Sequence, residues 1–191
     1  MQWRNTTDGY GLVAILLHWL VALAVIGLFA LGLWMVELTY YDDWYRTAPF
    51  IHKSVGILLF LAVSLRLVWR LVNPRPAPIG KPLERRLAHV VHLALYGLLF
   101  AIMFAGYLIS TADGRPIEVF GWFEVPATIT GIENQEDVAG VVHLWLAWTL
   151  IGLVVLHALA ALKHHFFNRD RTLRRMLRPR ASQQLHSQHK E

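Results

Sequence analysis

The sequence of 191 residues contains no cysteine. This absence excludes disulfide bonds, thiolate metal sites, iron–sulfur clusters and covalent attachment of a c-type haem. Charged side chains are also scarce, at 16% of the chain, against about 25% in ordinary soluble domains. Together with 55% hydrophobic residues, this composition is typical of a small integral membrane protein and not of a soluble domain.

Four apolar runs are long enough to cross a membrane, at residues 11–36, 50–72, 87–110 and 138–162. Each supplies about 20 residues or more, which as a helix spans a hydrocarbon core of ~30 Å. Helices satisfy their own backbone hydrogen bonds in lipid, so helices are expected here. The first run is too long for the core of a signal peptide and lacks a cleavage pattern. We therefore expect an all-α, four-helix transmembrane bundle.

Charge predicts the orientation of this bundle. Basic residues gather in two places: between the second and third runs, with Arg66 and Arg70 counted there, and after the fourth run. The other two connections are acidic. The positive-inside rule then places both termini in the cytoplasm. We expect one transmembrane domain over residues 1–178 and a polar cytoplasmic tail over 179–191. The basic tail is expected to contact anionic lipid and not nucleic acid.

Two histidines, His143 and His157, share the fourth apolar run. On a helix, fourteen residues turn to about 40° short of four full turns and rise roughly 21 Å, so both side chains share a face. His18 lies at the depth of His157, near the cytoplasmic side, and His52 lies at the depth of His143, near the outer side. A single intramembrane histidine is often a core residue bonded to a carbonyl, but two depth-matched pairs indicate ligation.

Imidazole pairs between facing helices suit haem iron, because a neutral imidazole binds iron through one ring nitrogen. No cysteine or carboxylate is available at these depths. The pattern predicts two haem b groups, one held by His18 and His157 and the other by His52 and His143. His92 shares the inner depth and stays open as an alternative ligand. Iron with two axial imidazoles has no open position, which favours electron transfer over oxygen chemistry.

Side chains near both membrane surfaces are candidates for electron entry and exit. At the cytoplasmic end of the fourth run, His164, His165 and Lys163 are candidate contacts for a quinone head group. On the outer side, Lys53, Arg46 and Arg115 carry the positive charge. They are candidate partners for haem propionates or for a small anion such as superoxide.

Several motifs then carry a family resemblance over residues 9–177: ILLHWLV, IHKSVGILL leading to RLVWRL, LAHVVHLALY, GRPIEVFGWFEVPA and VVHLWLAWTLIGLVVLHALAALKHHFF. They resemble the bacterial di-haem cytochrome b561 family of four-helix inner-membrane proteins. The resemblance implies the same ligand pairs, His18 with His157 and His52 with His143, and exchange of electrons with membrane quinone, so bound ubiquinone is expected.

The resemblance leaves the redox partner open. It implies either electron transfer between the quinone pool and a periplasmic donor or acceptor, or a superoxide:ubiquinone oxidoreductase acting alone. Related sequences are b-type subunits of larger dehydrogenases and hydrogenases. A histidine-bearing transporter or metal-binding membrane protein without haem is the alternative from another class, although neither inverted repeats nor broken helices are seen.

Overall fold

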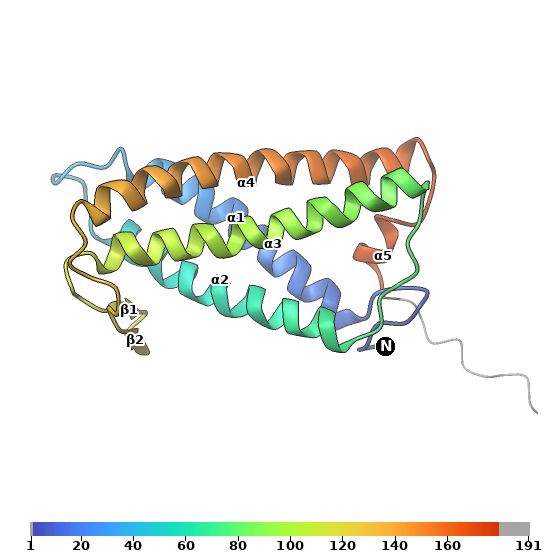
Figure 1. Ribbon diagram of the computed structural model, residues 1–191, viewed down its shortest axis with the longest axis horizontal. Coiled ribbons are helices and arrows are strands. Elements are labelled where there is room, and N and C mark those ends of the chain that lie inside the picture. The colour runs from blue at the N-terminus through green and yellow to red at the C-terminus, as the bar shows by residue number, and fades with distance from the viewer. Residues whose placement is uncertain (1, 180–191) are drawn as a thin grey trace, which may run out of the picture.

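The computed structural model describes residues 2–179 and contains four long helices with short elements at both ends (Figure 1). The long helices are α1 (Leu12–Met35), α2 (Thr47–Val72), α3 (Pro82–Thr111) and α4 (Gln135–Phe166). Each is long and apolar enough to cross a membrane. The predicted four-helix bundle is therefore confirmed. The predicted tail over 179–191 lies, beyond residue 179, outside the described residues.

The helix bounds differ from the predicted apolar runs mainly where polar turns extend a helix. Helix α1 agrees with the run 11–36 to within one residue at each end, but α3 begins at Pro82 and not at residue 87. Proline is favoured in the first turn of a helix because it needs no hydrogen-bond partner there. The carboxylate of Glu84 also accepts the backbone N–H of Lys81 at 2.9 Å. This capped turn extends α3 beyond the apolar run.

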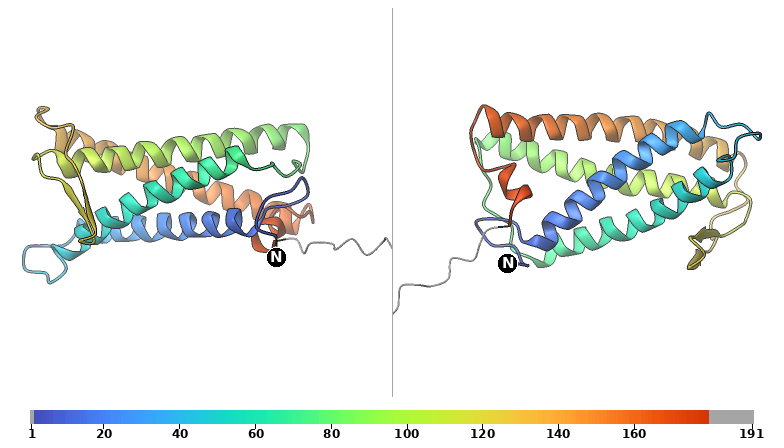
Figure 2. Two further views of the ribbon diagram at one scale, coloured as in Figure 1. Left: turned by 90° about the horizontal axis from the view of Figure 1, so that it is seen from below. Right: turned by 180° about the vertical axis from the view of Figure 1, so that it is seen from behind.

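The two ends of the bundle differ in charge. Residues 2–11, 73–81 and 167–179, which include the short helix α5 (Arg174–Leu177), form what we call the basic end (Figure 2). Residues 36–46 and 112–134 form the opposite, acidic end. The first described residues and α5 lie at the same end (Figure 1), as the predicted topology requires.

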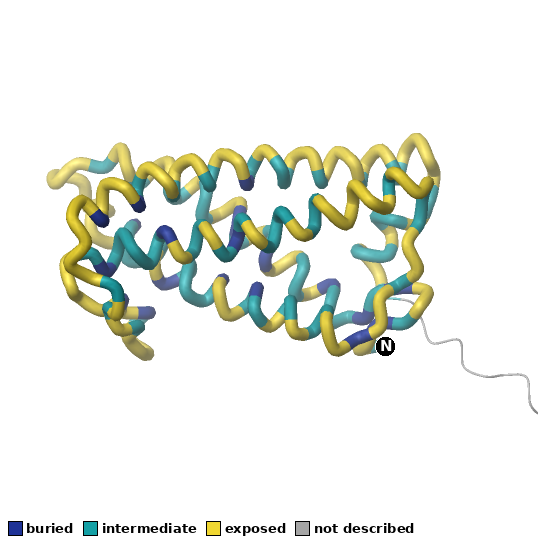
Figure 3. The backbone as a smooth tube through the Cα atoms, viewed as in Figure 1, coloured by how far each residue is buried: buried dark blue, intermediate teal, exposed yellow. Residues whose placement is uncertain are grey.

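Packing divides the bundle into two helical hairpins. Helix α1 packs mainly on α2 and α3 mainly on α4, whereas α1 and α4 make few contacts. One buried apolar cluster joins the hairpins at mid-height: Val21, Val25, Leu59, Val63, Leu99 and Leu150. Leu150 is seven residues from both His143 and His157, so this cluster separates the two histidine levels. Most residues of the four long helices are exposed or only partly buried (Figure 3), as expected for helices whose surfaces contact lipid.

A small β-hairpin, absent from the sequence prediction, caps part of the acidic end. Strands β1 (Ile117–Val119) and β2 (Phe123–Val125) pair antiparallel, with Glu118 opposite Glu124. The strands are joined by the three residues 120–122, and the Val119 carbonyl accepts the Trp122 N–H at 2.9 Å. The two central residues of this turn, Phe120 and Gly121, both have positive φ, 50° and 72°, as in a type I′ turn. Strand β1 packs on α2, where the Ser54 hydroxyl donates to the carbonyl of Glu118 at 3.4 Å.

Candidate functional site

His52 on α2 and His143 on α4 face each other near the acidic end of the bundle. Their ring centroids are 6.2 Å apart, with 66° between the ring planes. Nδ1 of His143 lies 2.9 Å from the backbone carbonyl oxygen of Ile102 on α3. A carbonyl only accepts hydrogen bonds, so Nδ1 carries the proton and Nε2 keeps its lone pair. This tautomer leaves Nε2 available to bind a metal ion.

Two glycines on the other two helices make room for these rings. A Cβ atom at Gly32 on α1 would lie 3.3 Å from Cε1 of His52, and a Cβ atom at Gly106 on α3 would lie 3.2 Å from Cε1 of His143. Both separations are shorter than an ordinary contact between carbon atoms. All four helices therefore shape this level of the bundle. The sequence analysis missed both glycines, because a contact with a ring on another helix leaves no local signal.

His18 on α1 and His157 on α4 form the second pair, nearer the basic end. Their ring centroids are 6.3 Å apart, with 69° between the ring planes. Nη2 of Arg66 on α2 donates to Nδ1 of His18 at 3.0 Å, so Nδ1 is the acceptor here and Nε2 carries the proton. Binding a metal through Nε2 of His18 would require the proton to move to Nδ1 and the Arg66 guanidinium to turn to another acceptor. His92 on α3 also faces this level, with its ring centroid 5.3 Å from that of His157. The structure thus brings both predicted histidine pairs together and places His92 beside the inner pair.

The separations within the two predicted pairs fit imidazoles on opposite sides of one metal ion. With a metal–nitrogen bond of about 2 Å and about 1.2 Å from ring nitrogen to ring centre, two imidazoles on opposite sides of one metal ion would have centroids roughly 6.4 Å apart. The observed values are 6.2 and 6.3 Å. The 5.3 Å between His92 and His157 is shorter than this arrangement requires. Among residues 2–179, no group of three or more metal-ligating side chains could hold a metal ion.

The predicted cations of the acidic end lie at the surface. Nε of Arg115 lies 2.7 Å from the carboxylate of Asp113, and its side chain is 83% exposed. The hydrogen bonds from the backbone and side chain of Arg115 lower the pKa of Asp113. Lys53 and Arg46 are exposed. These residues are accessible to a small anion, and within residues 2–179 no hydrogen bond or ion pair joins their side chains to the rings of His52 and His143.

The three predicted quinone contacts at the basic end have different surroundings. Lys163 donates to the carboxylate of Glu84 at 2.9 Å, and Nδ1 of His164 lies 2.6 Å from the carboxylate of Asp170. Burial raises the pKa of Asp170, but hydrogen bonds from Thr172 and His164 outweigh this effect and leave it lowered. Nδ1 of His165, by contrast, is buried and has no hydrogen-bond partner among the described residues.

Two arginines belong to the interior of the bundle and not to a connection. Arg66 and Arg70 lie in α2 and are partly buried, with their guanidinium carbons 5.5 and 5.7 Å from the ring centre of Tyr96 on α3. Counting them with the connection for topology overlooked this position. The available signal was their spacing, because residues four apart lie on one face of a helix inside a predicted span.

Comparison with known proteins agrees with this arrangement. The family model described as prokaryotic cytochrome b561 matches residues 9–179. The chain is 54% identical over 179 residues to cytochrome b561 homolog 2 of Escherichia coli (strain K12), which covers 93% of this chain and 95% of that protein. It is 33% identical over 175 residues to the probable superoxide oxidase CybB of Yersinia pestis, covering 88% and 95%.

A third relative is more distant. Cytochrome b561 homolog 1 of Escherichia coli (strain K12) is 29% identical over 130 residues, covering 66% of this chain and 72% of that protein. The family implies a b-type haem, and the paired histidines between apolar helices have the donor chemistry for one. The chain therefore belongs to the prokaryotic cytochrome b561 family, and is a multi-pass bacterial membrane protein and a b-type cytochrome that carries electrons.

Proposed function

We propose that this chain binds two haem b groups and exchanges electrons between membrane quinone and the periplasmic side of the bacterial inner membrane. His18 and His157 would hold one haem, and His52 and His143 the other. The observation that carries this proposal is the ring-centroid separation of 6.3 and 6.2 Å in the two pairs. When bound, haem held by these histidines would supply outer-sphere one-electron transfer.

The residues around the two pairs support transfer of electrons without passage of protons. His143 and His157 are fourteen residues apart on α4, so the two levels are separated by roughly 21 Å along the helix axis. The apolar cluster around Leu150 lies between these levels and is buried. A packed apolar layer excludes water, so it offers no hydrogen-bonded chain along which a proton could move. Proton exchange would then occur only at the quinone end.

His165 is our candidate for the quinone contact at the basic end. Its buried Nδ1 has no hydrogen-bond partner among the described residues, and a buried polar atom without a partner is costly. A quinone carbonyl would accept a hydrogen bond from this imidazole. Lys163 and His164 are weaker candidates, because their side chains pair with Glu84 and Asp170.

Haem content of histidine variants tests the proposal. A pyridine haemochrome assay of the purified wild-type chain should give two b haems per chain. His143→Ala and His157→Ala should each lose one haem and keep the other, and His89→Ala, at an exposed position, should keep both. Absence of haem from the wild-type chain would refute the proposal and favour the alternative of a haem-free transporter or metal-binding protein.

A second candidate function is oxidation of superoxide with ubiquinone as electron acceptor. The observation that favours it is the exposure of Lys53 and Arg46 at the acidic end, where positive charge attracts an anion. One relative is named as a probable superoxide oxidase. Reduction of the haems by superoxide should then be fast, slow down as salt is added, and weaken in Lys53→Gln. Slow reduction that salt does not change would exclude this function.

A further inference from the structure

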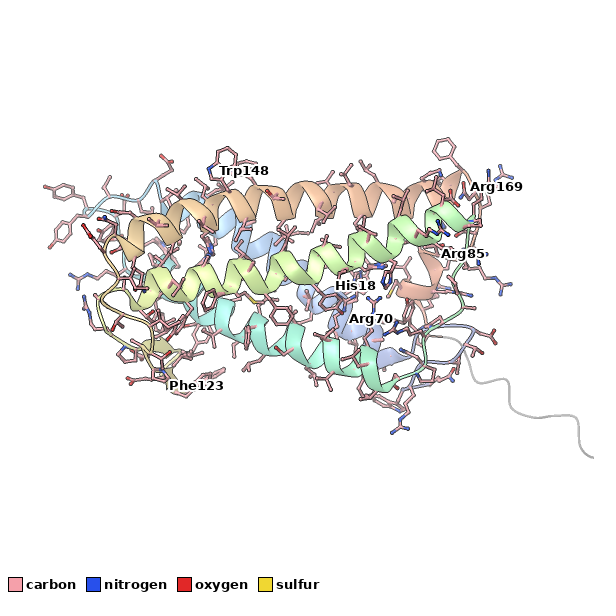
Figure 4. The ribbon with its side chains drawn as sticks, in the orientation of Figure 1. His18, Arg70, Arg85, Phe123, Trp148 and Arg169 are labelled. Carbon is pink, nitrogen blue, oxygen red and sulfur yellow. The ribbon has the colours of Figure 1, made fainter. Side chains whose placement is uncertain are left out.

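Two positive side chains lie close together inside the bundle, near the inner histidine pair. Arg66 and Arg70 are four residues apart on α2, and both guanidinium groups lie over the ring of Tyr96 on α3. Arg66 also contacts His18 at 3.0 Å. Figure 4 shows Arg70 and His18 in the same half of the bundle, toward α5. These residues form one cluster that spans α1, α2 and α3.

This cluster has positive charge without a matching carboxylate. The three ion pairs within residues 2–179 involve Arg115, Lys163 and His164, so neither Arg66 nor Arg70 has a carboxylate oxygen within 4.0 Å there. Both arginines lie within a candidate membrane span and are partly buried. Like charges four residues apart on a helix repel each other, and a charge inside a membrane is costly unless it is paired. A bound anion would compensate this charge.

The hydrogen-bond donors of the cluster also indicate an anionic ligand. The hydroxyl of Tyr96 is buried and has no hydrogen-bond partner among the described residues. A guanidinium group only donates hydrogen bonds, and a phenol can donate one as well. A neutral quinone carbonyl would accept these bonds but would leave both charges uncompensated. A carboxylate accepts these hydrogen bonds and also neutralises positive charge, and its two oxygens match the forked geometry of arginine.

We propose that Arg66, Arg70 and Tyr96 form an oxyanion site that binds the propionate carboxylates of the haem held by His18 and His157. This inference rests on the proposed function. It gives the inner haem propionate partners of its own, whereas the exposed cations of the acidic end, Lys53, Arg46 and Arg115, lie on the side of the outer histidine pair. A phosphate, free or on a lipid, has similar chemistry and is the competing source of the anion.

The test compares native haem with haem dimethyl ester, in which both propionates are esterified. The host is the full chain carrying His52→Ala, which should retain only the inner haem, and the readout is the rate at which bound haem passes to a haem-scavenging protein. Arg66→Gln and Arg70→Gln should each release native haem about tenfold faster, because a charge-assisted hydrogen bond is lost. Arg86→Gln, at an exposed position of α3, is the matched control and should release haem at the unsubstituted rate.

The ester identifies the source of the anion. If the propionates occupy the site, the ester should leave the unsubstituted host about tenfold faster than native haem, and Arg66→Gln should add little further loss. If esterification changes nothing while Arg66→Gln still accelerates release, the anion is a phosphate and the propionate assignment is wrong. Unchanged release from Arg66→Gln and Arg70→Gln would refute the oxyanion site itself.

Two further measurements keep the result interpretable. Tyr96→Phe removes only the hydroxyl, and should accelerate release of native haem but not of the ester. This readout remains valid if an arginine variant fails to fold. The haem count of the wild-type chain is measured in parallel: two haems with unchanged release from the arginine variants would refute the oxyanion site alone, whereas no haem in the wild-type chain would refute the proposed function.

Discussion

Three imidazoles meet at the inner level of the bundle, and their separations distinguish them. The rings of His18 and His157 are 6.3 Å apart, whereas those of His92 and His157 are 5.3 Å apart. Because two imidazoles on opposite sides of one metal ion would need roughly 6.4 Å, we expect His92→Ala to keep both haems and His18→Ala to lose one. Pyridine haemochrome counts and visible spectra of the two variants check this prediction. The opposite pattern would make His92 the ligand.

The two glycines beside the outer histidine pair allow a test in which small side chains are added next to a histidine ring. A Cβ atom at position 106 would lie 3.2 Å from Cε1 of His143, so a side chain there must displace the ring. We expect Gly106→Val to lose most of the outer haem and Gly106→Ala to lose less, since the ring must move by only a few tenths of an ångström for alanine. The haem content and the reduced spectrum of each variant measure the loss.

Gly97 provides the control for this prediction. It lies on the same helix, α3, and no atom would come within 4 Å of a Cβ atom there. Gly97→Ala should therefore keep both haems, and should even favour the helix slightly, because alanine has a higher helix propensity than glycine. Equal haem loss in Gly97→Ala and Gly106→Ala would show that steric contact with His143 is not the cause.

At the scale of elements, the sequence predicted the helices well because each is an uninterrupted apolar run. It did not predict where polar turns would extend them, since the turn at Pro82 depends on a hydrogen bond from Lys81 to Glu84. It also missed the β-hairpin. The first central residue of its turn is Phe120 with φ of 50°, a conformation that favours glycine or asparagine, so Phe120 gave no turn signal.

The candidate site was also predictable only in part: features fixed by spacing along one helix were predictable, and features fixed by contacts between helices were not. Both histidine pairs were predictable, because residue spacing on a helix fixes depth and membrane topology aligns depth between helices. The cluster of Arg66, Arg70 and Tyr96 was not, because it depends on which faces of α2 and α3 meet. Spacing along one helix does not determine its rotation toward a neighbour.

Tyr107 is one of the residues that hold the connection between α3 and α4, and it gives a prediction for this element. The Tyr107 hydroxyl donates to the carbonyl of Pro126 at 2.9 Å and accepts the backbone N–H of Thr128 at 2.7 Å. The same hydroxyl also lies 2.8 Å from Oγ1 of Thr128. Tyr107→Phe removes all of these hydrogen bonds, at a cost of about 1 kcal/mol each. We expect faster hydrogen exchange at the Thr128 amide with haem content unchanged. Tyr41→Phe, where the side chain is 93% exposed, should not alter that exchange.

At the scale of the whole molecule, each proposed haem would join the two helical hairpins. The His18–His157 pair connects α1 to α4, and the His52–His143 pair connects α2 to α4. Helices α1 and α4 otherwise make few contacts. In lipid, helix association depends on packing and polar contacts, since the hydrophobic effect does not distinguish a neighbouring helix from an acyl chain. Cofactor binding should therefore contribute much of the association between the hairpins.

Cutting the connection between the hairpins would measure this contribution directly. A protease site inserted after Ile79, in the connection between α2 and α3, should yield after cleavage an α1–α2 fragment and an α3–α4 fragment that copurify in mild detergent while haem is bound. In the His18→Ala/His52→Ala variant, which should bind no haem, the fragments should separate, because a ligand at 1,000 times its Kd stabilises the bound state by about 4 kcal/mol. The exposed control His89→Ala should stay together after cleavage. Fragments of the haem-free variant that remain associated would mean that packing of α2 on α3 and of the apolar cluster around Leu150 is sufficient to hold the bundle.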